Sequence, residues 1–232
     1  MALYIIPTPI TENILDTIPE NVIDIMHSIN FFIVERTRTA RRYIKASGYK
    51  DKIDDLIFFE LDKRNPHDIP DDFLKPALEG NDMGLMSEAG MPGIADPGAL
   101  VIAKAHELGI EVKPLTGPSS IFLALAASGM NGQNFTFDGY LPVKLPELKK
   151  KLRYIEKDIL SNKVSHIFIE TPYRNNRLIE TIINFVNDKI KLCVASEITG
   201  SQEFIQTKTI AKWKKHTIPD FNKKTCIFLL GN

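Results

Sequence analysis

Short apolar runs alternate with segments of helical spacing along most of this 232-residue chain, and that alternation constrains its fold more than any other feature. In the first half, the apolar runs expected to be strands occupy residues 3–6, 31–34, 56–59, 84–86 and 110–115. Segments with apolar residues three or four apart, which predict helices, lie between them at residues 22–29, 37–48 and 99–108. Strands separated by helices are typical of βαβ units, which build largely parallel sheets. The first half therefore predicts an α/β domain with a mostly parallel sheet.

The second half has a different pattern, because its closing strands follow one another. Strands are expected at residues 135–141, 166–169, 192–195, 203–209 and 225–230, and helices at residues 145–160 and 175–186. A run of strands without intervening helices favours antiparallel pairing. We therefore expect a second α/β domain with a mixed sheet, and we place the two domains at residues 1–116 and 117–232.

Composition narrows the class of protein and its surroundings. The net charge is zero, so no overall attraction to nucleic acid or an anionic membrane is expected. Cys193 and Cys226 each lie in an apolar run, and we interpret them as buried free thiols of a cytosolic protein. No apolar run approaches the length of a membrane span, and the chain begins without a signal-peptide pattern. A cytoplasmic protein with no membrane partner is the expectation.

Two loops dense in glycine and proline follow strands of the first half, at residues 87–98 and 116–120. Glycines such as Gly90, Gly93 and Gly98 adopt positive φ readily and leave backbone amides uncovered, while the prolines stiffen the same loops. Rigid, open loops at the carboxyl ends of strands are where α/β proteins bind small ligands. Two such loops close together favour a ligand site over ordinary strand-to-helix turns. Neither has a dinucleotide or phosphate-loop glycine pattern, so a standard pyrophosphate cradle is not expected.

Single residues in these loops leave alternatives open. Glu88 either faces a cation or a ribose hydroxyl, or is a solvated loop carboxylate. Asp96, followed by Pro97 and Gly98, is most simply the turn that starts a helix. The Pro-Thr-Pro run at residues 7–9 either forms the wall of a pocket or is a plain connection, and taken alone it is interpreted as the connection.

Acidic and arginine side chains follow two other predicted strands. The run Glu-Arg-Thr-Arg at residues 35–38 opens a segment with five basic side chains within ten residues. Arginine forks match phosphate oxygens, so this segment favours a phosphate-facing patch over a surface ion pair of little energetic value. The run Glu-Thr-Pro-Tyr-Arg at residues 170–174 repeats the pattern and is interpreted as part of a pocket. Thr37, and Ser196 or Thr199, are expected to cap helices.

Other site chemistries find little support in the sequence. The five histidines are scattered, and no His, Cys and acid cluster has the spacing of metal ligands, so no metal is expected. A Gly-x-Ser-x-Gly nucleophile elbow is also absent from the sequence.

In their order along the chain, these motifs resemble those of one known family. They include Pro-Thr-Pro-Ile at residues 7–10, Ser-Glu-Ala-Gly-Met-Pro-Gly at 87–93 and Thr-Gly-Pro-Ser-Ser at 116–120, together with the two acid-and-arginine runs. The chain resembles the tetrapyrrole methylase superfamily over residues 3 to about 199, and within it the 2′-O-ribose methyltransferases of small-subunit ribosomal RNA. This resemblance implies two α/β domains, a homodimer and S-adenosyl-L-methionine as cofactor, folded between the domains.

The resemblance also implies roles for particular residues. It places Glu35, Arg38 and Arg174 on the acceptor side, with Glu35 as the base that takes the hydroxyl proton. The residues that it implies for the cofactor are Pro9, Ile10, Ser87, Glu88, Ala89, Gly90, Ile94, Gly117, Pro118, Ser119, Ser120, Thr171, Glu197 and Thr199.

Some positions depart from the usual family motifs. Arg36 replaces an acid, Tyr173 replaces a histidine, and Glu88 and Met91 replace an aspartate and a threonine. Because two of these departures lie on the acceptor side, three functions stay open: methylation of ribosomal RNA or the small ribosomal subunit, methylation of a small molecule such as a tetrapyrrole, and a non-catalytic binding or assembly module. The arginine-rich segment favours RNA, whereas the zero net charge favours a small molecule.

Overall fold

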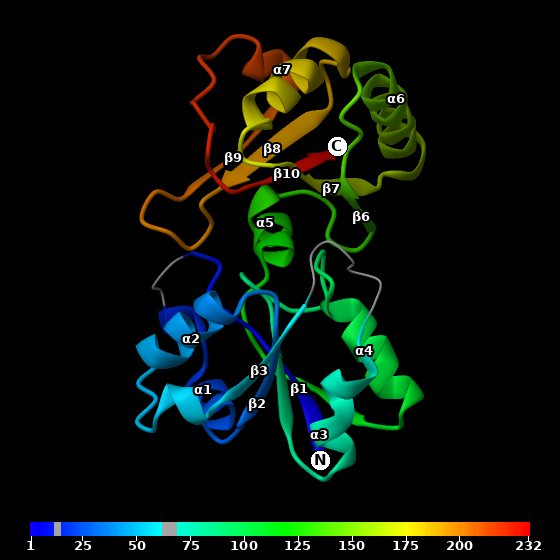
Figure 1. The fold of residues 1–232 in the computed structure, drawn as a ribbon. Helices are drawn as coiled ribbons and strands as arrows, with labels where there is room; N and C mark the ends of the chain where they lie inside the picture. Colours follow the sequence, from blue (N-terminus) through cyan, green and yellow to red (C-terminus); the bar gives the residue numbers. More distant parts are fainter. Residues whose placement is uncertain (12–14, 62–68) are drawn as a thin grey trace. The chain divides into compact units, whose positions relative to one another are not determined.

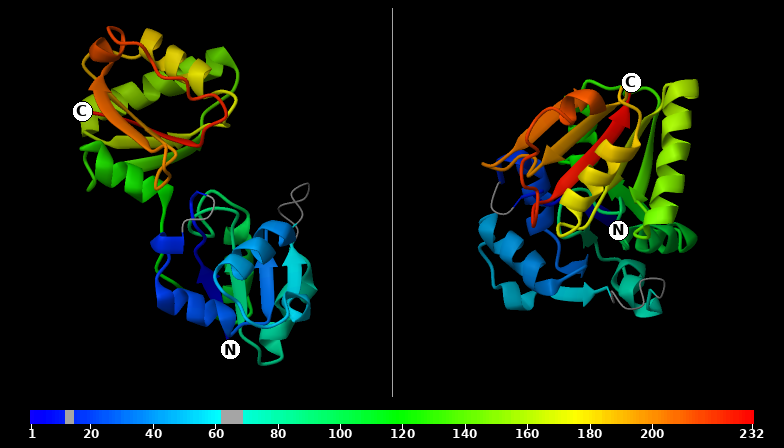
Figure 2. Two further views of the ribbon diagram at one scale, coloured as in Figure 1. Left: turned by 90° about the vertical axis from the view of Figure 1, so that its left-hand side faces the viewer. Right: turned by 90° about the horizontal axis from the view of Figure 1, so that it is seen from above.

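The computed structural model describes residues 1–11, 15–61 and 69–232. The chain divides into two compact units, Met1–Ser119 and Ser120–Asn232 (Figures 1 and 2). The boundary expected from the sequence, after Thr116, lies in the loop that precedes this division, at residues 115–119.

A five-stranded sheet of order β3-β2-β4-β1-β5 forms the centre of the N-terminal unit. Every pairing in it is parallel, which confirms the sheet type predicted from the alternation of strands and helices. Its strands are β1 (Ala2–Ile6), β2 (Phe31–Val34), β3 (Ile57–Glu60), β4 (Met83–Met86) and β5 (Glu111–Pro114). The helices are α1 (Glu20–His27), α2 (Thr37–Ala46), α3 (Lys75–Leu78) and α4 (Gly98–Glu107), with short 3-10 turns at Leu15–Thr17, Ile53–Asp55 and Asp71–Leu74.

Successive side chains of the central strands enter opposite cores, because strand side chains alternate between faces. Ile6 of β1 packs with α1 and α2, whereas Ile5 packs with α3 and α4. The same division holds in β4 for Met86 and Leu85. Helices cover both faces of the sheet (Figure 1), which is why its central strands β1, β2 and β4 are almost continuous apolar runs, whereas the edge strands β3 and β5 contain charged residues.

The strand register brings three loops to one edge of this sheet. Ile6 of β1 and Val34 of β2 both pair with Met86 of β4, so these strands end at the same level. The loops that follow them therefore start side by side at the carboxyl edge, where α/β sheets bind ligands.

The C-terminal unit contains a mixed sheet of order β6-β7-β10-β8-β9. β6 and β7 are parallel, and the remaining pairings are antiparallel, as the closing run of strands predicted. The strands are β6 (Phe135–Tyr140), β7 (Ser165–Ile169), β8 (Lys191–Ser196), β9 (Phe204–Thr209) and β10 (Cys226–Gly231). The helices are α5 (Ser120–Ser128), α6 (Leu145–Asn162), α7 (Asn175–Phe185) and α8 (Ile210–Trp213).

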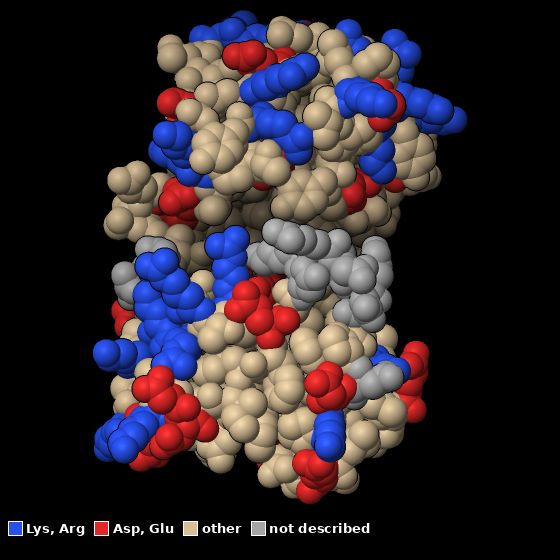
Figure 3. Space-filling view, in the orientation of Figure 1, with Lys and Arg blue, Asp and Glu red and all other residues tan. Residues whose placement is uncertain are grey.

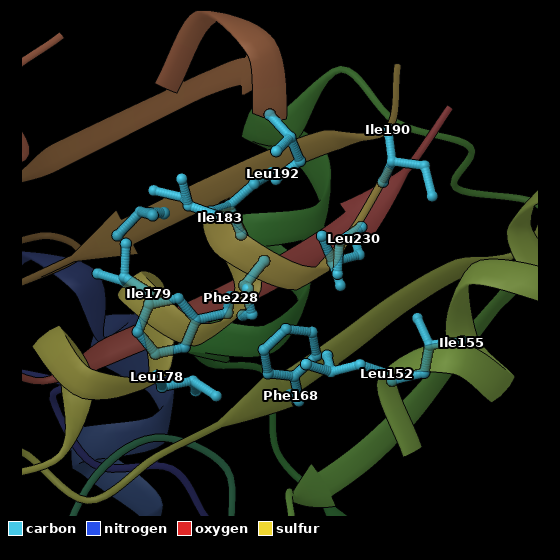
Figure 4. Close-up of a cluster of buried hydrophobic side chains, with 14 of the residues drawn as sticks. Leu152, Ile155, Phe168, Leu178, Ile179, Ile183, Ile190, Leu192, Phe228 and Leu230 are labelled. Atoms are coloured by element: carbon cyan, nitrogen blue, oxygen red, sulfur yellow. The ribbon is translucent and has the colours of Figure 1, made fainter. Parts of the chain in front are cut away.

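The larger core of this unit lies between the sheet and helices α6 and α7 (Figure 4). Phe168 and Phe228 stack at its centre, with ring centroids 5.9 Å apart and planes 18° apart. Helix α5 covers the opposite face through Ile121 and Leu125. Cys193 and Cys226 are both buried and free, as expected from the apolar runs in which they lie. Within the described ranges, no helix is long and apolar enough to cross a membrane.

Three local predictions were wrong. Thr37 does not cap α2; Arg36 holds the cap position, and the Thr37 amide donates instead to Glu60 Oε2 at 2.7 Å. Ser196 and Thr199 cap no helix, because turns at residues 197–203 join β8 directly to β9. Gly98 lies in the first turn of α4 and lacks the positive φ found at Gly90 and Gly93.

Candidate functional site

A pocket of about 430 Å³ opens in the N-terminal unit where the first three loops of the carboxyl edge meet α2. The loop after β1 contributes Thr8, Pro9 and Ile10, and the loop after β4 contributes Ser87 and Glu88. The remaining wall is formed by the start and one face of α2, including Arg36, Arg38, Arg42 and Tyr43. This volume is in the range of small-ligand sites.

The loop after β1 and the first glycine-rich loop are joined by backbone hydrogen bonds. The Thr8 amide donates to the Gly90 carbonyl at 2.9 Å, and the Gly90 amide donates back to the Thr8 carbonyl at 3.1 Å. Gly90 has a φ of +76°, a conformation that costs other residues strain. This pairing fixes one wall of the pocket and explains why a glycine stands at that position.

The second glycine-rich loop reaches the same place. A Cβ added at Gly117 would lie 2.2 Å from the Pro7 ring, so no larger residue fits there without movement. The Pro118 carbonyl oxygen lies 3.5 Å from the position that a Cβ would take on Gly90. The two glycine-rich loops thus meet beside the loop after β1, as their shared position after parallel strands suggests.

Asp96 holds the far end of the first glycine-rich loop. Its carboxylate accepts hydrogen bonds from the amides of Gly93, at 2.9 Å, and Gly98, at 2.7 Å. Burial raises the pKa of the Asp96 carboxyl above its ordinary value, although the two amide bonds favour the charged form, and the charge of Glu35 adds to the rise. The interpretation of Asp96 as the turn that starts α4 is confirmed.

Two contacts tie the loop after β2 to the loop after β4. Glu35 Oε1 accepts a hydrogen bond from the Glu88 amide at 3.0 Å. Arg36 Nε lies 3.2 Å from Glu88 Oε1 in an ion pair whose side chains are 60% and 36% exposed. A pair so exposed contributes little to stability, about 0–1 kcal/mol. The pair has a local consequence: Glu88, the acid of this loop nearest the strand end, lines the pocket as a paired carboxylate.

The arginines of α2 are divided between two sides of the helix. Arg38 and Arg42 are four residues apart, so they lie on one face, and both line the pocket. Arg41 points elsewhere: it pairs with Asp54 and lies over the Phe58 ring at 5.9 Å. Only part of the basic segment therefore lines the pocket, and its phosphate-facing role stays a prediction.

Tyr43 is a pocket residue that sequence reasoning did not assign to the site. Its buried hydroxyl donates to the Pro7 carbonyl at 3.3 Å, and burial raises the pKa of Tyr43 to about 12. It therefore stays a neutral hydrogen-bonding group at physiological pH. Thr39 and Tyr43 are four residues apart and follow Arg38 and Arg42 directly in sequence. Helical periodicity would therefore have placed Tyr43 on the same side of the helix as the two arginines.

The residues expected to form the site divide between the two units. Among those of the N-terminal unit, the pocket brings together Pro9, Ile10, Arg38, Ser87 and Glu88. On the adjoining loops lie Glu35, Ala89, Gly90, Ile94, Gly117, Pro118 and Ser119. The C-terminal unit carries Ser120 at the start of α5, Thr171 and Arg174 after β7, and Glu197 and Thr199 after β8.

The loop after β7 forms a compact acid-and-arginine cluster. Arg174 Nε donates to Glu170 Oε1 at 2.9 Å and to Thr171 Oγ1 at 3.0 Å. The Glu170 side chain is only 6% exposed, whereas Arg174 is 32% exposed. The buried glutamate thus orients a guanidinium at a strand end, and the pocket role expected for this run stays a prediction.

The turn after β8 carries unusual backbone conformations. Glu197 and Thr199 have φ values of +51° and +68°, which are uncommon for residues other than glycine. The Glu197 carboxylate stabilises the turn by accepting from the Thr225 amide at 2.6 Å and from its hydroxyl at 2.9 Å. Strain of this kind gathers at ligand sites, so it supports a functional role for the turn.

Comparison with known proteins identifies the family. The model of the Tetrapyrrole (Corrin/Porphyrin) Methylases matches residues 17–213, which is most of the chain. The chain belongs to the tetrapyrrole methylase family. It is therefore a methyltransferase, as the resemblance of its motifs predicted.

Several relatives of this tetrapyrrole methylase share one name. The chain is 31% identical to "Ribosomal RNA small subunit methyltransferase I" of Vibrio cholerae over 224 residues, or 96% of this chain and 73% of that protein. The protein of the same name from Escherichia coli O157:H7 is 28% identical over 222 residues, 96% of this chain and 74% of its own. The structure titled "Crystal structure of the methyltransferase CobJ" superposes with a TM-score of 0.67 at 16% identity, over 100% of this chain and 94% of the other, which confirms the fold.

Metal chemistry finds no support in the part of the chain that the structure describes. No group of three His, Cys, Asp or Glu side chains is arranged there to hold an ion. The family assignment also removes the non-catalytic alternative.

Proposed function

We propose that this tetrapyrrole methylase transfers the methyl group of S-adenosyl-L-methionine to a ribose 2′-hydroxyl of small-subunit ribosomal RNA. The observation that carries the proposal is the arginine-walled pocket beside the two glycine-rich loops. The arginines suit an anionic acceptor chain, and the loops suit a small nucleoside-like cofactor. The name shared by the relatives from Vibrio cholerae and Escherichia coli O157:H7 supports the choice of ribosomal RNA.

The residues of these loops fit the proposed cofactor. Gly90 and Gly117 keep the loop backbones free of side chains where they converge with Pro7 and Pro118. Pro9 and Ile10 offer apolar surface. These are the features that a ligand with an adenine ring, ribose hydroxyls and an amino-acid tail requires. The motif resemblance also implies Thr171, Glu197 and Thr199, which the C-terminal unit carries.

The cofactor supplies a methyl group on a positively charged sulfur, and the protein has to align the acceptor oxygen with it. Strong negative charge around sulfur would oppose the reaction, because the positive charge disappears as the methyl group moves. Glu88 is the one acidic residue among the described lining residues of the pocket, and its negative charge is balanced by Arg36, whose Nε lies 3.2 Å from Glu88 Oε1.

The acceptor hydroxyl must lose its proton as its oxygen bonds to the methyl carbon. We assign Glu35 as the base that takes that proton. The hydrogen bond from the Glu88 amide, at 3.0 Å, orients the Glu35 carboxylate at the carboxyl edge of the sheet. The motif resemblance assigns both Arg38 and Arg174 to the acceptor side, and within the C-terminal unit Glu170 holds the Arg174 guanidinium at 2.9 Å.

The proposal includes a homodimer, which the motif resemblance implies, and a cytoplasmic location, which the composition of the chain favours. Size-exclusion chromatography with light scattering should then give a mass of twice the 26.2 kDa of one chain. A mass of 26.2 kDa at micromolar concentration contradicts the dimer.

The acceptor is tested by direct comparison. Purified protein with radiolabelled S-adenosyl-L-methionine is offered unmodified small-subunit ribosomal RNA, assembled small subunits, or a tetrapyrrole precursor. The proposal predicts saturable transfer to RNA or to the small subunit, and none to the tetrapyrrole. Transfer to the tetrapyrrole alone refutes the RNA assignment. Glu35→Gln is expected to bind cofactor normally and to slow transfer by about 10²-fold or more, because a general base typically contributes that much.

A further inference from the structure

The charges of this neutral chain are divided unevenly between its two units. The N-terminal unit, Met1–Ser119, has 12 lysines and arginines against 19 acidic residues, whereas the C-terminal unit, Ser120–Asn232, has 17 against 10. The first unit is therefore acidic and the second is basic. Figure 3 shows lysine and arginine side chains over much of the visible face of the C-terminal unit. A polyanion such as RNA is attracted to that unit, although the whole chain carries no net charge.

Aromatic rings hold three of the cations of the C-terminal unit in place. Lys149 Nζ and Arg153 Cζ, both on α6, lie 5.5 and 5.2 Å from the centroid of the Phe185 ring at the end of α7. Lys208 Nζ of β9 lies 5.0 Å from the centroid of the Trp213 ring. A ring attracts a cation through its π face but carries no net negative charge. These side chains are therefore positioned while their positive charge is retained.

The connection between α7 and β8, residues 186–190, joins these cations to a second group on α8. Phe185 directly precedes the connection. Within it, the Asp188 carbonyl accepts from the Ala211 amide at 3.1 Å, and the Asp188 carboxylate pairs with Lys214 Nζ at 2.6 Å. The connection thus lies between α6 and α8. The cations around it, which we call the basic end, are Lys149, Arg153, Lys189, Lys208, Lys212, Lys214 and Lys215.

The basic end keeps most of its positive charge at the surface. Lys189, Lys212 and Lys215 are exposed. Among the described residues, Asp188 is the one carboxylate at ion-pair distance from the group, and it neutralises a single lysine. Clustered lysines and arginines of this kind are the electrostatic signature of a surface that binds nucleic-acid phosphates.

The basic end lies at the opposite end of β8 from the turn that the motif resemblance assigns to the cofactor. Residues 186–190 lead into the start of the strand, and Glu197 follows its last residue. Six residues of strand span about 20 Å. A ligand that contacts both ends of β8 must therefore be extended, as an RNA strand is.

We propose that the basic end of the C-terminal unit is a docking surface for the phosphate backbone of the RNA, remote from the ribose that is methylated. The inference rests on the proposed function for the identity of the RNA. Phosphate contacts carry no sequence information, so this surface supplies affinity and orientation, whereas the choice of ribose belongs to the loops around the cofactor. Loss of the surface should raise the KM for RNA and leave kcat and the affinity for S-adenosyl-L-methionine unchanged.

Pairs of substitutions test the two halves of the basic end. Lys212→Gln with Lys215→Gln removes two charges from α8 and the residues that follow it. Lys50→Gln with Lys52→Gln is the matched control, because it makes the same change at two exposed lysines of the N-terminal unit outside the pocket lining. Thermal unfolding of each variant identifies any that fails to fold.

The second pair, Lys149→Gln with Arg153→Gln, removes the two cations that lie over the Phe185 ring. Binding of a fluorescent single-stranded fragment of small-subunit ribosomal RNA is measured at a series of salt concentrations. Each phosphate contact to a single strand contributes about 0.7 to the slope of log affinity against log salt concentration. We expect each pair in the basic end to lower the affinity about ten-fold and the slope by about 1.4, and the control to match the wild type.

The outcomes separate this inference from the proposed function. Unchanged affinity and slope in the basic-end variants refute the docking surface, and methyl transfer to RNA by the wild type then still supports the function. Equal losses in the control also refute the surface, because they indicate a diffuse charge effect. Loss of binding to phosphatidylserine vesicles without loss of RNA affinity assigns the surface to a membrane instead. If the wild type binds RNA through the basic end but transfers no methyl group to it, the proposed function fails and the docking surface stands.

Discussion

Asp96 fixes the shape of the first glycine-rich loop, and its replacement tests whether that shape is needed for cofactor binding. Its carboxylate accepts from the amides of Gly93 and Gly98 at 2.9 and 2.7 Å. A hydrogen bond to a charged group contributes about 1.5–3 kcal/mol, and water can replace part of it because Asp96 is only partly buried. We expect Asp96→Ala to lower the free energy of unfolding of the N-terminal unit by about 3 kcal/mol. Because the loosened loop must then be ordered when the cofactor binds, the cofactor affinity of Asp96→Ala should fall about ten-fold, or by about 1.4 kcal/mol.

Asp96→Asn is the matched control, because its side-chain oxygen still accepts from the amides without carrying charge. The pKa of the native carboxyl is raised, so the folded state holds a proton at a pH where the unfolded chain has lost it. The contribution of Asp96 to stability therefore increases as the pH falls through the raised folded pKa toward 3.8, and its ionisation costs stability at neutral pH. The stability of Asp96→Asn relative to the wild type should accordingly be highest near pH 7 and lower near pH 4.

Amide hydrogen exchange of residues 87–98 measures the loop directly, and calorimetry with S-adenosyl-L-methionine measures its consequence. The chain has one tryptophan, Trp213, buried in the C-terminal unit, so its fluorescence serves as an internal control that should not change. Faster exchange in Asp96→Ala with unchanged cofactor affinity would refute the link between loop shape and binding. Unchanged exchange would refute the structural role of the carboxylate itself.

Two further predictions concern glycine conformation and a buried charge cluster. Gly90→Ala and Gly48→Ala both place a side chain at positive φ, +76° and +88°, and each should lower the free energy of unfolding by about 1–2 kcal/mol. Calorimetry should show weaker cofactor binding for Gly90→Ala only, because Gly48 lies outside the pocket lining. Equal cofactor affinities of the two variants would contradict the site. In the C-terminal unit, burial opposes ionisation of Asp138, yet hydrogen bonds from His166 and Lys151 lower the pKa of Asp138. The contribution of Asp138 to stability is thus present above the unfolded pKa and is lost as the pH falls through the lower folded pKa. Asp138→Asn should therefore lower the free energy of unfolding in urea by about 3 kcal/mol at pH 7 and by less near pH 3. A loss of stability that does not depend on pH would contradict this prediction.

Much of the fold follows from local patterns in the sequence. The parallel N-terminal sheet was predictable because each apolar run is followed by a segment of helical period, and the right-handed crossover leaves few other arrangements. Gly90 and Gly93 were expected at positive φ, and they adopt it. Cys193 and Cys226 were expected to be buried because each belongs to an apolar strand-like run, and they are.

The details of the site depend on contacts between distant segments, which no local pattern contains. Thr37 was expected to cap α2, but Glu60 from β3 takes its amide, a contact across 23 residues. The pairing of Arg36 with Glu88 likewise joins loops after different strands. Tyr43 was missed because its apolar neighbours on α2 made it look like core, although its hydroxyl reaches the pocket wall.

The position of the transferred methyl group on RNA tests the central claim most directly. Alkali cleaves RNA only next to a free 2′-hydroxyl, so a 2′-O-methylated ribose survives hydrolysis within a dinucleotide. Unmodified small-subunit ribosomal RNA is methylated by the wild-type protein with labelled S-adenosyl-L-methionine, hydrolysed in alkali and separated by size. The account predicts that the label elutes with a dinucleotide, and that Arg38→Gln lowers its amount at limiting RNA. Label on mononucleotides would place the methyl group on a base, and absence of label from RNA would contradict the account altogether.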